Sequence, residues 1–390
     1  MTVYADNAAT TRCGEAALNA MLPFFREEYG NASSLHAYGQ RAADALQQAR
    51  ESVARSLGAL PQEIYFTGSG SESGNQAIRS AALTGARRGK RHLITCAIEH
   101  HAVLHTLDAL AKEGFELTVL PVDEYGLVTP EQVAGAIRED TALVTVMAAN
   151  NEIGVIEPVA EIAAICREKG VIFYTDATQA VGHIPVDVKA LGADMLSFSG
   201  HKFHGPKGVG VLWCRTGVPL LSLIHGGGHE RNRRAGTENI PGIVGLAAAL
   251  EEAVAALEET VPKISAMRDR LIAGLSKIER SRLNGHPAKR LPGTVNFCFE
   301  GIEGESLLLL LDQRGICASS GSACTSGSLD PSHVLLALGL PHEIAHGSLR
   351  LSLSRENTDA EIDHILASVP PVVKYLRSIS PVWEALQERV

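Results

Sequence analysis

Short runs of β-branched and aromatic residues alternate with stretches of helical apolar spacing up to about residue 215 of this 390-residue chain. The clearest strand-like runs are 63–67, 92–95, 142–147, 171–175, 195–198 and 208–213. Between them lie stretches such as 158–169, which is followed by Gly170 in the position that a helix C-cap favours. This alternation predicts an α/β fold with a mostly parallel sheet covered by helices.

The pattern changes after about residue 243, where an Ala- and Glu-rich stretch (244–257) indicates a connecting helix. A second domain is expected there, because single hydrophobic cores stop growing near about 250 residues. Its predicted strands are 293–298 and 348–352, and its predicted helices are 305–314 and 359–366.

Composition and charge narrow the function classes. A formal charge of -9 and a pI near 5.9 leave no basic face for a nucleic-acid backbone, so nucleic acid is not an expected partner. The first residues lack a secretory signal pattern, and no apolar run approaches the span of a bilayer helix. We therefore expect a cytoplasmic protein with no membrane partner.

Seven cysteines at irregular spacing, with no C-x-x-C pair, favour reduced thiols over a disulfide framework or structural zinc. Most are expected to be small core residues. Cys324 differs, because it lies in a run of Gly, Ser and Ala (318–328) that indicates an accessible loop. The alternatives are a nucleophile with long reach and an inert linker thiol.

The densest group of polar residues is 197–208, where a predicted strand ends. Ligands bind at such strand ends in open α/β sheets. Lys202, among Ser199, His201 and His204, is placed to form a Schiff base, since burial and nearby cations activate an amine. The alternative is a Gly/Pro loop with solvated charges.

Asp176 ends the preceding predicted strand and is followed by Gln179. An aspartate there can pair with a protonated pyridine nitrogen, which is the electron-sink arrangement of pyridoxal phosphate. Gln179 could donate to the phenolic oxygen of that cofactor. The alternative for Asp176 is a helix N-cap.

A glycine-rich turn, 66–75, precedes a helix-patterned stretch at 76–88. Small residues before a helix let the backbone approach a phosphate, although many such turns only change chain direction. The spacing does not match the triphosphate-binding loop, so nucleoside triphosphates are disfavoured.

His100 follows the predicted strand 92–95, where an imidazole could stack on an aromatic cofactor. The alternative is a metal site, to which 225–229 would add histidines. We expect no metal, because no pair of histidines four residues apart comes with an acidic partner on a predicted helix.

Together these segments resemble the cysteine desulfurases of the NifS/IscS type, which are class V aminotransferase-like, fold-type I pyridoxal-phosphate enzymes. The resemblance covers nearly the whole chain, and the cysteine segment is most similar to the NifS-like branch. The matching motifs are 6–11, 99–104, 149–154, 176–180, 197–210, 225–228, 236–239, 317–329 and 350–356.

The resemblance implies a large cofactor-binding domain (15–256) and a small α+β domain (1–14 and 257–390) that carries the cysteine loop. It also implies a homodimer that uses pyridoxal 5'-phosphate and takes L-cysteine as substrate. The product would be L-alanine, with the sulfur passed as a persulfide to an iron–sulfur scaffold or another acceptor protein.

The resemblance assigns a role to each matched residue. Lys202 would form the Schiff base and move the substrate Cα proton, His100 would stack on the ring and assist proton transfer, and Cys324 would take the sulfur. The remaining implied roles are Asp176 at the pyridine nitrogen, Gln179 at the phenolic oxygen, Gly70, Ser71, Ser199, His201 and the second subunit's Thr237 at the phosphate, and Arg350 with Asn151 and Asn7 at the substrate carboxylate.

Three positions depart from the family pattern. Ser71 stands where threonine is common and keeps a hydroxyl, whereas Ala32 and Ala235 replace a proline and a serine. The other functions considered are selenocysteine lyase, another class V reaction that does not need Cys324, and a non-catalytic scaffold for sulfur-cluster assembly. Retention of both Lys202 and Cys324 argues against a silent scaffold.

Overall fold

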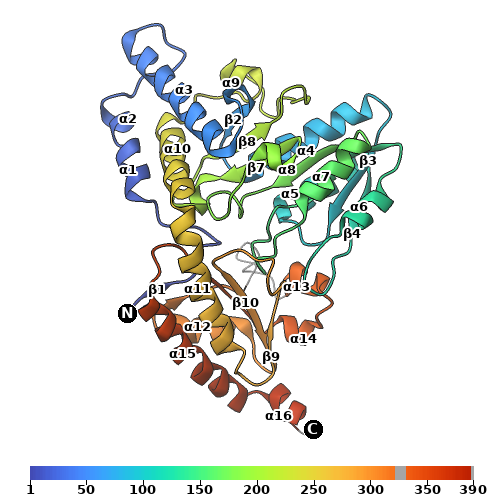
Figure 1. The fold of residues 1–390 in the computed structure, drawn as a ribbon, viewed down its shortest axis with the longest axis vertical. Helices are drawn as coiled ribbons and strands as arrows, with labels where there is room; N and C mark the ends of the chain where they lie inside the picture. The colour runs from blue at the N-terminus through green and yellow to red at the C-terminus, as the bar shows by residue number, and fades with distance from the viewer. Residues whose placement is uncertain (321–330, 388–390) are drawn as a thin grey trace.

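The computed structural model describes residues 1–320 and 331–387, so Cys324 and most of the predicted loop 318–328 lie outside the described residues. Two sheets with separate cores form the framework, and the long helices α10 (Ile240–Ala255) and α11 (Leu257–Leu275) run between them (Figure 1).

Seven strands form the larger sheet, in the order β2-β8-β7-β6-β5-β3-β4. Neighbours from β4 to β7 are parallel, whereas β8 is antiparallel to both β7 and β2. The strands are β2 (Ile64–Thr67), β3 (His92–Cys96), β4 (Glu116–Leu120), β5 (Thr141–Thr145), β6 (Ile172–Asp176), β7 (Met195–Ser199) and β8 (Gly210–Cys214). The predicted mostly parallel sheet is confirmed.

Helices cover both faces of this sheet. On one face, Leu93, Leu143 and Met195 pack with α4 and α5, and the next residue of each strand packs on the other face with α3, α7 and α10. Burial on both faces explains why these strands read as continuous apolar runs. The pattern does not predict β4, because this edge strand pairs only with β3 and is half exposed.

The helices that accompany the larger sheet include the long covering helices and several short ones. They are α1 (Glu15–Met21), α2 (Pro23–Arg26), α3 (Ala37–Leu57), η1 (Pro61–Glu63), α4 (Gly70–Ala86), α5 (His101–Lys112), α6 (Pro130–Ala136), α7 (Val159–Glu168), α8 (Val188–Leu191), η2 (Gly200–Lys202) and α9 (His229–Asn232). Gly170 follows α7 with φ 63°, as the sequence predicts for a C-cap.

Helix α4 begins at Gly70, six residues before the start that apolar periodicity predicts. Ser69 is its N-cap and accepts a hydrogen bond from the Glu72 amide, while the Glu72 carboxylate accepts one from the Gly68 amide. These local bonds turn most of the predicted glycine-rich loop into the first helical turns. The exposed N–H groups of the helix therefore lie at the end of β2.

The smaller sheet is antiparallel, in the order β12-β10-β9, and β1 (Val3–Tyr4) pairs separately with β11 (Ile316–Cys317). Its strands are β9 (Ser281–Leu283), β10 (Thr294–Phe299) and β12 (Ser348–Ser352), and its helices are α12 (Gly304–Asp312), α13 (His333–Ala337), α14 (His342–Ala345), α15 (Asp359–Ser378) and α16 (Pro381–Gln387). Helices α11, α12 and α15 pack on this sheet in a second core.

Helix α15 continues twelve residues beyond the predicted end at 366, through Pro370 and Pro371. Prolines disfavour a helix interior, but Val369, Val372 and Val373 are buried in the second core. Tertiary packing therefore outweighs the local signal. Among the described residues no single helix is long and apolar enough to cross a membrane, and the pair α10 and α11, which passes that test jointly, is bent by 74°.

A buried ion pair holds a left-handed stretch of backbone beside β2. Residues 230–232 have φ of 45°, 55° and 62°, which is unfavourable for side chains with a Cβ. The Arg50 guanidinium donates to both carboxylate oxygens of Glu230 at 2.7 and 2.8 Å, and the Phe66 amide donates to the same carboxylate at 3.0 Å. The Arg50 and Glu230 side chains are only 7% and 2% exposed.

We expect Glu230→Gln to lower the free energy of unfolding by about 3 kcal/mol, because it leaves the Arg50 charge buried without its counterion. Denaturant titration measures this loss. Glu113→Gln, which breaks a much more exposed pair with Arg79, is the matched control and should cost about 0.5 kcal/mol or less. Equal losses in the two variants would contradict a structural role for the buried pair.

Candidate active site

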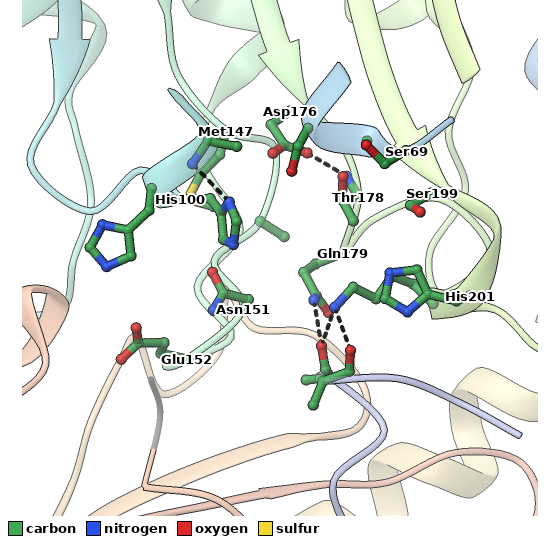
Figure 2. A pocket seen from close by; sticks show the side chains of 18 of the residues that line it. Ser69, His100, Met147, Asn151, Glu152, Asp176, Thr178, Gln179, Ser199 and His201 are labelled. Atoms are coloured by element: carbon green, nitrogen blue, oxygen red, sulfur yellow. Dashed lines mark hydrogen bonds between the residues drawn. The ribbon is translucent and has the colours of Figure 1, made fainter. Parts of the chain in front are cut away.

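A cavity of about 310 Å³ lies where the carboxyl ends of β6 and β7 meet the N-termini of α4 and α5 (Figure 2). It collects most of the residues singled out in the sequence. Those that line it are Gly70, Ser71, His100, Asn151, Asp176, Gln179, Ser199, His201, Lys202 and Arg350.

Of the predicted residues that the structure describes, two do not line this cavity. Asn7 is buried beside it, and its amide nitrogen donates to the carbonyl oxygen of Ser352 at 2.9 Å. Thr237 is exposed and outside the cavity of its own chain. Asn7 therefore acts here as a backbone anchor. The expected role of Thr237 requires a second subunit.

Lys202 ends η2, directly after β7, and its side chain reaches the N-terminal segment. Its Nζ donates to the carbonyl oxygens of Ala8 at 2.7 Å and Ala9 at 2.9 Å. The Gln179 amide nitrogen also donates to the Ala8 carbonyl, at 3.0 Å. The chain start and the end of β7, about 190 residues apart in sequence, therefore meet at the lysine amine.

Asp176 is the last residue of β6. Its Oδ1 accepts a hydrogen bond from the Thr178 amide at 2.9 Å, which forms a turn. The side chain thus makes the local backbone bond expected of an N-cap residue, but it caps a turn and no helix follows directly. Asp176 also lines the cavity, so this local hydrogen bond leaves its carboxylate at a position where a ligand can bind.

His100 is the N-cap of α5, and its Nδ1 accepts from the Ala102 amide at 3.1 Å. Burial lowers the pKa of His100, although the nearby Asp176 carboxylate opposes this shift. The ring is therefore neutral at neutral pH, and because Nδ1 is an acceptor the proton is on Nε2. The ring can offer one N–H group to a ligand in the cavity.

The N-terminus of α4 closes one end of the cavity. A Cβ at Gly70 would lie 3.3 Å from Thr178 Oγ1 and 3.4 Å from Ser199 Cβ, and one at Gly210 would lie 2.4 Å from the Ser69 carbonyl carbon. Glycine is needed at 210 so that β8 can pass this close to the helix start. The first N–H groups of α4 lie among small side chains, which is an arrangement that can bind an anion.

His201 also lies at this end, where its Nδ1 is 3.1 Å from Thr10 Oγ1. Burial, with the charges of Lys202 and Lys207, lowers the pKa of His201 to about 4. The imidazole is therefore uncharged at neutral pH. An anion at this position would be held by hydrogen bonds and the helix dipole, without a positive charge from His201.

Arg350 lies in β12 and is almost completely buried. Its Nη1 donates to the Asn151 carbonyl oxygen at 3.0 Å, and its Nη2 pairs with Asp6 Oδ1 at 2.8 Å. Asn151 thus contacts the guanidinium through its backbone. Asp6 was not among the predicted site residues, although it begins the family motif 6–11.

Glu152, Ser332 and His333 form a further polar group that the sequence reasoning missed. The Ser332 hydroxyl donates to Glu152, whose pKa is raised by burial. His333 Nε2 donates to the Glu99 carbonyl oxygen at 3.0 Å, and Glu152 and His333 both line the cavity. Glu152 follows Asn151 in the family motif 149–154, and this position is the sequence signal that could have identified it.

His101 and His105 are four residues apart on α5, and the His101 ring lies 4.9 Å from His105 and 4.6 Å from His333. In the described part of the chain, no group of three His, Cys, Asp or Glu side chains is arranged to hold a metal ion.

Four cysteines, at positions 96, 166, 214 and 298, are buried, as the sequence predicts for core thiols. Burial raises the pKa of Cys166 and Cys214 to about 12 and of Cys298 to about 11. These thiols are therefore protonated and unreactive. Cys13 and Cys317 are partly exposed, and Cys324 lies outside the described residues.

Comparison with known proteins places this geometry in context. The family model Aminotransferase class-V matches residues 3–365. The chain is 55% identical over 380 residues to a cysteine desulfurase IscS of Methanosarcina thermophila, covering 97% of this chain and 94% of that protein. It is 49% identical over 383 residues to a cysteine desulfurase NifS of Azotobacter vinelandii, covering 98% and 95%.

Solved structures agree with the sequence comparison. A NifS-like protein superposes with a TM-score of 0.91 at 42% identity, over 96% of this chain and all of that one. A structure described as SspA in complex with cysteine superposes with a TM-score of 0.81 at 37% identity, over 92% of this chain and all of that one.

His183, which contacts the backbone of Lys202, makes the stability of the folded chain depend on pH. Its Nε2 lies 3.0 Å from the Lys202 carbonyl oxygen, and burial lowers its pKa to about 4. The unfolded chain, with a histidine pKa near 6.5, binds a proton between these values that the folded chain excludes. Stability is therefore lost as pH falls from about 6.5 toward about 4.

We expect His183→Gln to retain more of its stability at low pH than the unmodified chain does, because glutamine can donate the same hydrogen bond without titrating. Urea midpoints at about pH 7.5 and about pH 5 measure the difference. The exposed His342→Gln variant is the control and should follow the unmodified chain. An unchanged pH dependence in His183→Gln would rule out this source of acid sensitivity.

Proposed function

The chain belongs to the aminotransferase class-V family, among its cysteine desulfurases, and we propose that it uses pyridoxal 5'-phosphate to remove sulfur from L-cysteine. The products are L-alanine and a persulfide on Cys324. One observation carries the proposal: a single cavity joins the amine of Lys202, the carboxylate of Asp176 and the guanidinium of Arg350.

The residues present fit the proposed cofactor. Lys202 offers an amine for its aldehyde, and Asp176 offers a carboxylate for its pyridine nitrogen. The N-terminus of α4, with Ser71 and Ser199, offers hydrogen-bond donors for its phosphate. When bound, the cofactor would supply an electron sink for the substrate carbons. Neutral His100 is a suitable ring to stack on it.

Arg350 is the proposed site for the substrate carboxylate. A guanidinium can donate two parallel hydrogen bonds to a carboxylate, and burial strengthens this interaction. Asp6 and the Asn151 carbonyl fix the orientation of the guanidinium before substrate arrives. Asp6 is an additional acceptor that the substrate has to share or displace.

Lys202 and His100 are the groups proposed to move protons. Lys202 is placed to take the proton from the substrate Cα once its own amine is free. His100 presents its Nε2–H to the same cavity, because its Nδ1 is occupied by the Ala102 amide. Both groups reach the cavity from strand and helix ends and are held by backbone contacts.

The described residues on either side of Cys324 support its role. Ser319 pairs with Arg350 through backbone hydrogen bonds of 2.6 and 3.2 Å, and His333 lines the cavity. The described chain before Cys324 therefore lies beside Arg350, and the described chain after it reaches the same cavity at His333. The Cys324 thiolate would form a bond to the substrate sulfur as the Cβ–S bond breaks, and protonation of the remaining carbon skeleton gives alanine.

We further propose a homodimer in the cytoplasm that passes its sulfur to an iron–sulfur scaffold or another acceptor protein. The exposed position of Thr237 suits a residue that acts in the cavity of a second subunit. Exposed apolar side chains near the chain start suit a subunit contact. They are Leu18, Leu22, Phe25, Tyr29 and Leu35.

We expect Cys324→Ala to abolish sulfide release from L-cysteine and to leave the yellow absorbance of the bound cofactor unchanged, because the thiol acts only on sulfur. Peptide mass spectrometry after incubation with cysteine should find the persulfide at Cys324 in the unmodified chain. Cys13→Ala is the control. Sulfide release by Cys324→Ala at the unmodified rate would overturn the proposal.

Arg350→Lys should raise KM for L-cysteine about tenfold to hundredfold, because one paired contact to a charged group is lost. Steady-state assays of alanine formation measure the change, and cofactor binding should persist. Arg355→Lys is the matched control, since Arg355 pairs with Glu252 outside the cavity. An unchanged KM in Arg350→Lys would place the substrate carboxylate elsewhere.

A further inference from the structure

The N-terminal segment 5–14, here called the strap, joins β12 to the loop that carries Lys202. At its first end, the Asn7 amide nitrogen and side-chain nitrogen both donate to the Ser352 carbonyl oxygen, at 3.2 and 2.9 Å. The Ala8 amide donates to Ser352 Oγ at 2.9 Å, and the Ser352 amide donates to the Ala5 carbonyl at 2.7 Å. This end is fixed to the smaller sheet.

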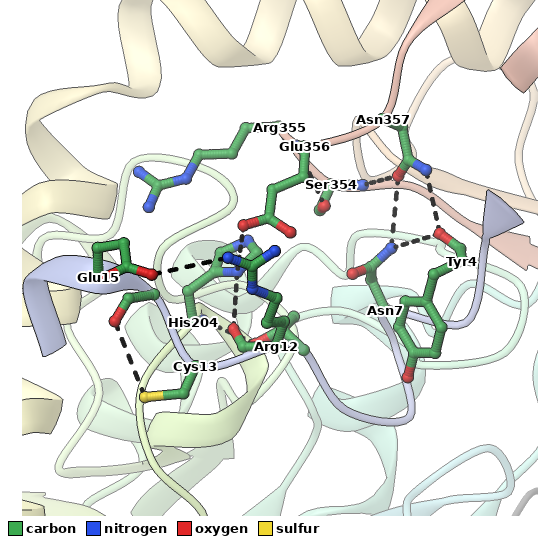
Figure 3. Close-up of polar contacts among 12 residues, drawn as sticks. Tyr4, Asn7, Arg12, Cys13, Glu15, His204, Ser354, Arg355, Glu356 and Asn357 are labelled. Carbon is green, nitrogen blue, oxygen red and sulfur yellow. Dashed lines mark hydrogen bonds and ion pairs between the residues drawn. The ribbon is translucent and has the colours of Figure 1, made fainter. Parts of the chain in front are cut away.

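The second end of the strap is fixed to the loop that follows Lys202, where Arg12 lies against His204 (Figure 3). The Thr11 hydroxyl donates to the His201 carbonyl oxygen at 2.9 Å and accepts from the His204 amide at 2.8 Å. The Gly14 amide donates to the His204 carbonyl, and His204 Nδ1 donates to the Arg12 carbonyl. His204 has φ 67°, so these bonds hold the loop in an unfavourable conformation.

Between its two anchored ends, the strap presents two carbonyl groups to the cavity. The Ala8 and Ala9 oxygens accept from Lys202 Nζ, and Ala8 and Ala9 both line the cavity. The methyl side chains of Ala8 and Ala9 cannot form hydrogen bonds, so the position of the two carbonyl oxygens depends on the backbone alone. Thr11 and Asn7 fix that backbone on the two sides of the carbonyl pair.

We propose that the strap is a docking site for the amine of Lys202 when substrate has displaced it from the cofactor, with Thr11 and Asn7 as its positioning residues. The proposal rests on the function proposed above for Lys202. A displaced amine has to stay close to the reacting carbons to move a proton and later return. Two carbonyl acceptors at hydrogen-bond distance hold it there.

The alternative is that the strap only joins the two sheets. Such a role predicts that strap variants lower stability while leaving the reactivity of Lys202 unchanged. The docking proposal predicts a change confined to that lysine. Lys207 and Lys169 are exposed and serve as internal references in the same sample.

The test is competitive labelling of the full-length chain with acetic anhydride, read by peptide mass spectrometry before and after pyridoxal phosphate is added. We expect Thr11→Val to raise the labelling rate of Lys202, relative to Lys207 and Lys169, by about fivefold in the cofactor-free chain. Valine keeps the shape of threonine but loses both hydroxyl bonds, so the carbonyl pair loses its alignment.

Thr11→Ser retains the hydroxyl, so its Lys202 should be labelled at the same rate as in the unmodified chain. The same rate is expected for Arg12→Gln, because the Arg12 side chain is exposed. Asn7→Ala should act like Thr11→Val from the other end, and it serves if Thr11→Val does not fold. If Lys202 is labelled in both Thr11→Val and Asn7→Ala at the same rate as in the unmodified chain, the docking proposal is overturned. Failure of pyridoxal phosphate to protect Lys202 in the unmodified chain would instead overturn the proposed function.

Discussion

The active-site cavity depends on parallel strands ending at one edge of a sheet. Because β6 and β7 are parallel neighbours, Asp176 and the Lys202 loop emerge side by side. The N-terminus of α4 arrives at the same edge because β2 runs in the same direction, on the far side of the antiparallel β8. One edge therefore supplies the carboxylate, the amine and the anion-binding helix end.

The second half of the site comes from the smaller sheet, and buried hydrogen bonds connect the two halves. Arg350 on β12 reaches Asn151 and Asp6, while the strap extends from Ser352 to the lysine loop. Burial lowers the pKa of His100 and His201 and keeps both rings neutral, so the charged groups that face the cavity include Lys202, Asp176 and Arg350. A substrate with one amine and one carboxylate matches that arrangement.

Local sequence signals and tertiary packing disagree at a few informative places. Apolar periodicity places the start of α4 too late, because Ser69 and Glu72 make capping bonds that periodicity does not register. The two prolines of α15 suggest a helix end that burial in the second core overrides. Edge strand β4 is too exposed to show the apolar run of its neighbours.

The sequence by itself determined the α/β class and the central strands, because burial on both sheet faces leaves a local pattern. Polar residues at strand ends indicated Lys202, Asp176 and His100, and the family resemblance supplied other cavity residues such as Arg350. Tertiary structure decided what those residues contact. The Ala8 and Ala9 carbonyls at Lys202, Asp6 at Arg350 and the anchoring role of Asn7 join segments about 190 to 350 residues apart. Backbone carbonyls have the same chemistry at every residue, so only the folded chain shows which of them meet an amine.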